Sequence, residues 1–314
     1  MNPIRPLAAL SLAVLLALPA CQPRGAAPSR EAARSAAAPT LEQLKNAAYL
    51  GLAEADACTL SAGRWEGVPA AGDSPVRPSV VYAGDFRLAG DLDGDGFEES
   101  VALLAASSGG TGENLYLAVV GTAGDTPRQL AIARIGDRVR VRDVRLDSNV
   151  VTLDVLQSGP EDPMCCPGEL ATRRWVFEGG ALAEQPSDAP PSRLTLNALG
   201  GVAWTLTAWD FGEPAPPEPS VTLEYRDGRI AGVAACNHYG AALTAGDGPG
   251  QFTVGPVVST RKRCAPPVMD TEARYLALLP RARRFSFAAT QLAITYDRPD
   301  GGMGTMYFAR EAGR

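Results

Sequence analysis

The sequence predicts an α+β protein of mainly antiparallel β structure, divided into two domains. Beyond residue 100, most apolar residues recur at every second position, which is the period of a half-buried strand. Only two segments, beginning near residues 40 and 267, have the period of an amphipathic helix. A proline-rich stretch at residues 184–193 interrupts the pattern and is interpreted as a linker. The about 275 residues that follow residue 39 also suit two domains of roughly 150 residues each.

The composition is that of a globular protein with a modest negative charge. Apolar residues make up 46% of the chain, which is enough to build a core, and the formal net charge is −6. This charge argues against nucleic acid and against an acidic lipid surface as a partner. No segment after the N-terminal one is apolar enough to cross a membrane.

The N-terminus has the features of an export signal. One positive charge, Arg5, precedes an apolar run at residues 7–18, and about a dozen residues are too few to span a bilayer as a helix. The run ends in Leu18-Pro19-Ala20-Cys21, which resembles the lipobox of bacterial lipoproteins. The resemblance implies that residues 1–20 are a signal peptide and that Cys21 becomes the lipid-modified first residue. The alternative is an ordinary secretory signal cleaved at or near Ala20, with Cys21 incidental.

Residues 21–39 are predicted to be the lipidated cysteine and a disordered tether. Residues 22–39 are almost all Ala, Pro, Arg, Ser and Gly, and they cannot bury enough apolar surface to fold. Acyl chains contribute about 0.8 kcal/mol per buried methylene, so several would anchor the protein to a membrane. Gln22 resembles the residue found after the cysteine in outer-membrane lipoproteins. We therefore expect a lipid-anchored protein of the cell envelope, on the periplasmic face of the outer membrane if the host is Gram-negative.

Residues 40–183 are predicted to form a mainly β domain behind one helix. Thr40 and Gln43 have the spacing of a capping box, and they predict a helix of about a dozen residues. Its apolar face would contain Leu41, Leu44, Ala48 and Leu52. Strands are predicted at residues 101–105, 115–121, 130–135, 139–146, 150–156 and 173–177.

Residues 194–314 are predicted to form a second β-rich domain with one helix. A helix at residues 267–279 would begin with Pro267, end before Pro280 and bury Met269, Ala273 and Leu276. One helix among many strands favours an antiparallel sheet or small barrel closed over that helix. The predicted strands are residues 203–208, 221–225, 230–235, 240–244, 252–254, 284–287, 292–296 and 305–308.

The motifs of this second domain resemble the META domain of HslJ-like proteins. They are Trp204, the segments 232–240 (GVAACNHYG) and 259–264 (STRKRC), and then Met269 and Glu272. The match spans roughly residues 197–310. Ala235 stands where the family usually has Gly, and Lys262-Arg263 where Met-Ala is common. The resemblance implies a curved antiparallel sheet with no established enzymatic chemistry, in a family associated with the envelope, motility or stress tolerance.

The segment 91–99 (DLDGDGFEE) is the clearest candidate metal site. Asp91, Asp93 and Asp95 precede a glycine at position 6, as in the first half of a calcium loop, and Phe97 would offer its backbone carbonyl. Glu99 falls at position 9, but the bidentate glutamate expected at position 12 is missing. The loop is more similar to the short calcium loops between strands of FG-GAP-type repeats. The sequence therefore predicts a Ca²⁺ site here, and the alternative is a solvated acidic turn.

The cysteines are expected to be oxidised in an exported chain. Cys236 and Cys264 are predicted to form a disulfide, whose loop would contribute roughly 3–4 kcal/mol in the chain-entropy model. Because adjacent cysteines rarely bond each other, either Cys165 or Cys166 is expected to pair with Cys58. The number of cysteines after Cys21 is odd, so at least one is left over.

Catalysis has weak support from the sequence. Cys236 could act as a nucleophile with His238 as its base, because residues two apart on a strand share a face. His238 is the single histidine of the chain, which excludes a His-rich zinc site, and a surface or turn role is favoured. The glycines at 109–112 lack the Lys-Ser/Thr of a phosphate loop and are interpreted as a hairpin loop.

These patterns favour a non-catalytic envelope lipoprotein that binds or supports another envelope component, a protein or a lipid. One alternative is a small-ligand or lipid-binding module that uses a concave sheet under the helix near Met269. Another is a calcium-binding protein of the adhesion type, and a third is an enzyme that uses Cys236 or the acidic loop.

Overall fold

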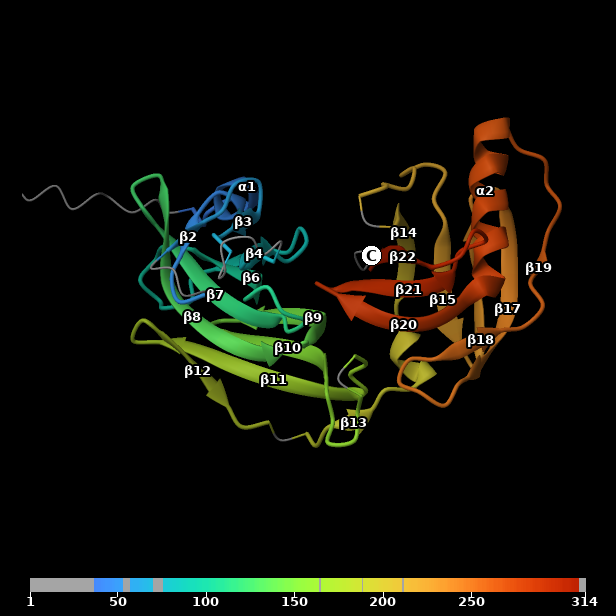
Figure 1. Ribbon diagram of the computed structural model, residues 1–314. Helices are drawn as coiled ribbons and strands as arrows, with labels where there is room; N and C mark the ends of the chain where they lie inside the picture. The colour runs from blue at the N-terminus through green and yellow to red at the C-terminus, as the bar shows by residue number, and fades with distance from the viewer. Residues whose placement is uncertain are drawn as a thin grey trace, which may run out of the picture. The chain divides into compact units, whose positions relative to one another are not determined.

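The computed structural model describes residues 37–52, 57–69, 76–163, 165–187, 189–210 and 212–310 (Figure 1). Every strand pairing in these residues is antiparallel, and no sheet there contains strands from both sides of residue 193. The mainly antiparallel fold class predicted from the sequence is confirmed. We call residues 37–193 the N-terminal module and residues 194–310 the C-terminal module. The predicted signal peptide, Cys21 and most of the tether lie outside the described residues.

The N-terminal module consists of two larger sheets and a two-stranded ribbon (Figure 1). The first larger sheet has the order β3-β4-β6-β7-β8 with β5 beside β6, the second has the order β12-β11-β10-β9 with β13 beside β11, and β1 pairs with β2. The strands are β1 (Ala48–Tyr49), β2 (Cys58–Thr59), β3 (Arg64–Glu66), β4 (Ser79–Tyr82), β5 (Leu88–Gly90), β6 (Glu99–Ser107), β7 (Asn114–Ala123), β8 (Thr126–Asp137), β9 (Arg140–Asp147), β10 (Val150–Gln157), β11 (Glu169–Glu178), β12 (Ala181–Gln185) and β13 (Ser192–Arg193).

The first larger sheet is covered on both faces, which makes β6 its most buried strand. Val101 and Leu103 face the second larger sheet and pack with Trp175 and other residues of β10 and β11. The alternate residues of β6, such as Leu104, pack instead with α1, β1 and β2. A strand buried on both faces reads as a continuous apolar run, and 101–106 has that composition.

The N-terminal helix is shorter than the sequence predicts. Helix α1 spans Leu41–Lys45, and the capping box of Thr40 and Gln43 is present. Asn46 ends the helix, because its side-chain amide donates to the carbonyl of Glu42 at 2.9 Å. The next residues pair as β1 with β2 instead of continuing the helix, so a dozen-residue helix is wrong. Pairing with a distant segment outweighs the local helical pattern here.

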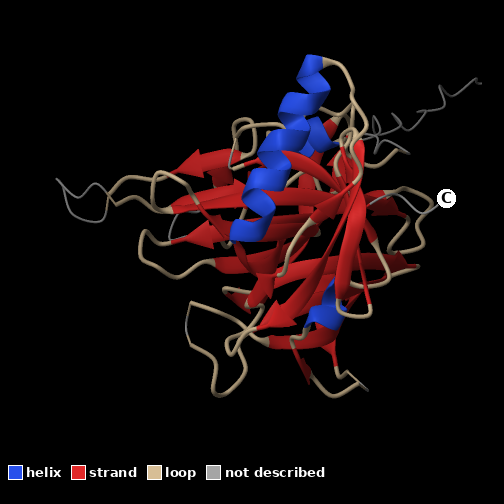
Figure 2. Cartoon of the chain, turned by 90° about the vertical axis from the view of Figure 1, so that its right-hand side faces the viewer, coloured by secondary structure: helices blue, strands red, loops and turns tan. Residues whose placement is uncertain are grey.

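The C-terminal module is a single curved sheet that nearly closes on itself. Its order is β18-β17-β16-β15-β14-β22-β21-β20, with β19 beside β17, and a bridge between Gln251 and Arg284 brings the two ends of the sheet together. Figure 2 shows α2 lying across these strands. The elements are η1 (Leu196–Leu199), β14 (Ala203–Trp209), β15 (Thr222–Arg226), β16 (Arg229–Ala234), β17 (Asn237–Ala245), β18 (Phe252–Val254), β19 (Val258–Ser259), α2 (Pro266–Leu278), η2 (Leu279–Arg281), β20 (Ala282–Ala288), β21 (Gln291–Asp297) and β22 (Met303–Arg310).

Helix α2 buries a different face from the one predicted. Its buried residues are Glu272, Tyr275 and Leu278, whereas Ala273 is exposed and Met269 half-buried. The hydroxyl groups of Tyr275 and Tyr239 lie 2.7 Å apart in the core. The apolar pattern misplaces the face because Glu272, a residue counted as polar, points inward.

Glu272 is buried because Asn237 binds it. The backbone N–H of Asn237 donates to Glu272 Oε2 at 2.7 Å, and its side-chain Nδ2 donates to Oε1 at 3.0 Å. The Nδ2 group also donates to the carbonyl of Lys262 at 2.9 Å. Asn237 Oδ1 accepts hydrogen bonds from Lys262 N at 2.6 Å and from Thr260 Oγ1 at 2.8 Å. One amide thus joins the start of β17, the segment 260–262 and α2.

The connection between β10 and β11 is held at its base by Asp162. The side chain of Asp162 is 1% exposed and lies 2.7 Å from Arg193 Nη1. The same carboxylate accepts the backbone N–H groups of Gly159 and Gly168, each at 2.7 Å. Burial tends to raise the pKa of Asp162, but these hydrogen bonds and the guanidinium lower it by more, so the net shift is downward. The expected linker 184–193 therefore takes part in this module through β13.

No helix among the residues described is both long enough and apolar enough to cross a membrane.

Replacing Asn237 with leucine is expected to destabilise the protein by about 3 kcal/mol, because it removes the side-chain amide from the buried carboxylate of Glu272 and from the segment 260–262, and only the backbone N–H remains as a donor. Urea unfolding followed by tryptophan fluorescence measures this change. The control is His238→Ala, which changes the exposed residue next to Asn237. Its free energy of unfolding is expected to stay within about 0.5 kcal/mol of the wild-type value. Adding Glu272→Met to Asn237→Leu should recover part of the loss. A loss below about 1 kcal/mol for Asn237→Leu alone would contradict this role.

Asp162→Asn is expected to cost about 2 kcal/mol at pH 7, because it removes the charged partner of Arg193 and keeps the shape of the side chain. The folded-state pKa of Asp162 is lowered, so its stabilising effect is present above the unfolded-state pKa of about 4 and is lost as pH falls through the folded-state value. Urea unfolding at several pH values should therefore show the two proteins converging in acid. Asp147→Asn, at the exposed end of β9, is the matched control. A gap that stays constant down to pH 2 would exclude the charge as its cause.

Candidate functional site

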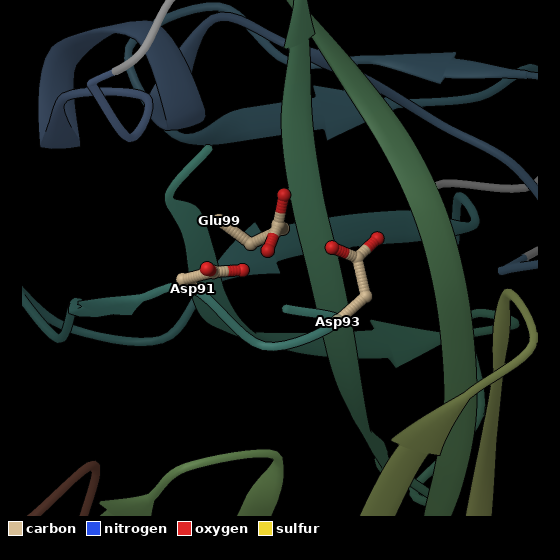
Figure 3. Close-up of side chains that lie close together, drawn as sticks. All are labelled: Asp91, Asp93 and Glu99. Carbon is tan, nitrogen blue, oxygen red and sulfur yellow. The ribbon is translucent and has the colours of Figure 1, made fainter. Parts of the chain in front are cut away.

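The acidic loop connects two paired strands of the N-terminal module. Strands β5 and β6 are antiparallel neighbours, and Gly90 lies opposite Glu99 at the end of the pair. Residues 91–98 therefore form the connection between them. Carboxylate oxygens of Asp91, Asp93 and Glu99 all lie within 4.8 Å of one another. Figure 3 shows these three side chains gathered at the end of the β5–β6 pair.

The loop backbone is shaped by Asp91. Its carboxylate accepts the N–H of Gly94 at 2.8 Å through Oδ1 and the N–H of Gly96 at 3.0 Å through Oδ2. Gly94 and Gly96 have φ values of 76° and 86°, a region in which other residues are strained. The two glycines allow the chain to bend around one carboxylate, as the sequence pattern indicates.

Glu99 anchors the group to the core. It is the first residue of β6 and has an exposed fraction of 0%, and its Oε2 accepts the N–H of Leu92 at 3.0 Å. Asp91 and Asp93 are exposed on the loop. The site thus combines one carboxylate fixed by the sheet with two that face solvent.

Two of the five residues predicted as ligands lie outside the close group of carboxylates. Asp95 Oδ1 accepts the N–H of Phe97 at 2.9 Å, so this carboxylate shapes the turn. The structure adds a cavity of about 390 Å³ that is lined by Asp91, Asp93, the turn at residues 148–149 and the end of β11 at residues 177–179. Glu178 brings a further carboxylate to this cavity, which sequence reasoning missed because the residue is far away in the chain.

The donor set suits a hard cation. Calcium prefers six to eight oxygen ligands, which include carboxylates, backbone carbonyls and water. The close group offers carboxylate oxygens alone, and the adjoining cavity has room for water. Asp91, Asp93 and Glu99 are therefore the residues of this loop that fit a calcium ion.

The second candidate site, Cys236 with His238, does not have a free thiol. Cys236 is bonded to Cys264 with a Cα–Cα distance of 6.1 Å, so the expected disulfide is present. His238 is exposed, and its backbone N–H donates to Thr260 Oγ1 at 3.2 Å. In this oxidised form Cys236 cannot act as a nucleophile, because its sulfur is already bonded.

The expected bond between Cys58 and the Cys165/Cys166 pair is wrong in this structure. Cys165 is bonded to Cys166, and Cys58 is a free cysteine. Cys58 lies on β2 and is fully buried in the core formed with α1 and β1. Its sulfur thus points into packed apolar side chains, and burial raises the pKa of its thiol.

The glycines at 109–112 lie between β6 and β7, where a hairpin loop was expected.

Comparison with known proteins gives one family match and one similar solved structure. No curated protein matches the chain. An NMR structure of a protein from Burkholderia xenovorans is 22% identical, and the match covers 41% of this chain and 97% of that chain with a TM-score of 0.29. The family model described as the META domain matches residues 197–311. These residues include the curved sheet, α2, the buried Asn237 and the Cys236–Cys264 disulfide, and a META domain is therefore present in the C-terminal part of this chain.

Proposed function

We propose that this protein is a lipid-anchored component of the bacterial cell envelope that binds or supports another envelope component without catalysing a reaction. The observation that carries the proposal is the META domain at residues 197–311. The sulfur of Cys236 is in a disulfide, and the carboxylate of Glu272 is held by Asn237.

The interior of the C-terminal module favours a supporting role over a lipid-binding one. The space between α2 and the sheet is occupied by buried side chains, which include Tyr239, Tyr275 and Leu278. An occupant of the size of an acyl chain would have to displace them. We therefore place the binding role of this module on its outer surface, with a protein of the envelope as the partner.

The acidic loop supports a second function in the N-terminal module. We propose that Asp91, Asp93 and Glu99 hold a calcium ion, because one buried and two exposed carboxylates converge there. The ion would neutralise the mutual repulsion of the three carboxylates and fix the β5–β6 connection against the neighbouring turns. This function is structural, as in adhesion-type calcium modules.

Membrane attachment through Cys21 tests the first proposal. The full-length chain is expected in the membrane fraction after alkaline extraction, and Cys21→Ser is expected in the soluble fraction, because the acyl chains supply the anchor. Immunoblots of the two fractions measure the distribution. Cys58→Ala controls for the loss of a cysteine and should remain with the membrane.

Two results would contradict this proposal. Recovery of the wild-type chain in the soluble fraction would show that the protein has no lipid anchor. Turnover of a peptide, ester or glycan by the purified protein, with loss of that activity on His238→Ala, would show that the protein is an enzyme.

Calcium is expected to bind with a dissociation constant of about 0.1–1 mM, the range of extracellular calcium modules. At 10 mM calcium, mass action predicts stabilisation of about 1.5–3 kcal/mol and a rise of several degrees in Tm. Differential scanning calorimetry in calcium and in EDTA measures the shift. Asp93→Asn should abolish the shift and Asp300→Asn, in an exposed turn of the C-terminal module, should leave it unchanged. An equal shift in wild type and Asp93→Asn would exclude this loop as the site.

A further inference from the structure

The connection between β10 and β11 carries two adjacent cysteines that are bonded to each other. Strand β10 ends at Gln157, β11 begins at Glu169, and the Cys165–Cys166 bond lies between them. Cys165 is exposed and Cys166 is partly exposed. A dissolved or protein-borne thiol can therefore reach this bond without unfolding of the sheet.

The two disulfides differ in the sequence separation of the cysteines that they join. Cys236 and Cys264 are separated by 28 positions, whereas Cys165 and Cys166 are separated by 1. The entropic stabilisation by a disulfide grows with the number of residues in the loop that it closes. A bond between neighbours closes the smallest loop, and it ties no other segment of the protein in place. Its contribution to folding is correspondingly small.

The base of the connection is held by other contacts. Asp162 binds the N–H groups of Gly159 and Gly168 and the guanidinium of Arg193. At the strand ends, Gln157 Nε2 donates to Glu169 Oε1 at 2.9 Å. These contacts do not pass through the sulfurs, so the disulfide can open and close while β10 and β11 remain paired.

We propose that the Cys165–Cys166 pair is a site of thiol–disulfide exchange whose partner is an envelope protein with a reactive dithiol. One partner thiolate attacks the sulfur of Cys165, the more exposed of the two residues, and forms a mixed disulfide while the Cys165–Cys166 bond breaks. Cys166 leaves as a thiolate and takes a proton from water. The partner's second thiolate then attacks the sulfur of the partner's first cysteine in the mixed disulfide. This step forms the partner's disulfide and releases the Cys165 thiolate, which takes a proton.

The electrons balance in this exchange. The partner dithiol is oxidised to a disulfide, and the Cys165–Cys166 pair gains two electrons and two protons. The proposal requires the export proposed above, because a pair kept in a reducing compartment would already be open. It does not depend on the calcium site or on the function of the META domain.

Graded reduction of the full-length chain tests the proposal. The protein, purified in detergent, is equilibrated with a series of dithiothreitol concentrations, alkylated with a maleimide, digested and analysed by mass spectrometry. Cys165 and Cys166 are expected to be labelled at a concentration about tenfold or more below that which labels Cys236 and Cys264, since exposed disulfides are the more easily reduced. The circular dichroism spectrum should stay unchanged at this first step.

Matched double variants separate exchange from a structural role. Cys165→Ser/Cys166→Ser should fold with a Tm close to wild type and lose the labelling at low dithiothreitol, whereas Cys236→Ser/Cys264→Ser should keep that labelling. In the single variant Cys165→Ser, the remaining Cys166 thiol should react with the disulfide 5,5′-dithiobis(2-nitrobenzoate) in the folded protein, forming a mixed disulfide and releasing 5-thio-2-nitrobenzoate. Simultaneous opening of both disulfides would overturn the proposal. So would a lower Tm for Cys165→Ser/Cys166→Ser than for Cys236→Ser/Cys264→Ser.

Discussion

The C-terminal module depends on the burial of one carboxylate. Glu272 has an exposed fraction of 6%, and a charge removed from water to this degree needs hydrogen-bond donors close to it. Asn237 supplies two of them, from its backbone and from its side chain. The remaining hydrogen-bonding groups of the same amide bind the segment 260–262. The helix, the start of β17 and the loop before α2 thus share one polar centre, and the Cys236–Cys264 bond joins two of these segments covalently.

The N-terminal module has a different organising constraint, the burial of β6 on both faces. Val101 and Leu103 pack on one side and Leu104 on the other, so the strand cannot shift by one residue without exchanging its two sets of side chains. Glu99 begins this strand, and its position is therefore fixed by the packing of the whole sheet. The other two carboxylates of the close group, Asp91 and Asp93, belong to an exposed, glycine-containing bend and can adjust to it. A fixed ligand beside adjustable ones is suited to a weak, selective oxygen site.

The sequence predicted the regular strands well, because each alternates buried and solvent-facing residues. Val139 and Val141 are buried between arginines, as the period of two indicates. Shorter strands such as β3, β5 and β19 were missed, since two or three residues are too few to establish a period. The two helix errors have a common cause. Neither the C-cap at Asn46 nor the inward direction of Glu272 can be predicted from apolar spacing, because both are set by hydrogen bonds.

The candidate sites show the same division between local and distant information. The grouping of Asp91 with Asp93 follows from local spacing around two glycines, whereas Glu178 lines the same cavity because the two larger sheets pack against each other.

The cysteines show how burial and sequence separation assign different roles to one residue type. Cys58 is enclosed by the core, and the raised pKa of its thiol lowers the fraction of reactive thiolate. Cys236 and Cys264 join segments that are distant in the chain, so their bond constrains the fold. Cys165 and Cys166 join neighbours on an exposed connection whose base Asp162 already secures. The Cys165–Cys166 bond stabilises the fold little and is the more exposed of the two disulfides. Redox chemistry in an exported chain is therefore expected at this pair before the other cysteines.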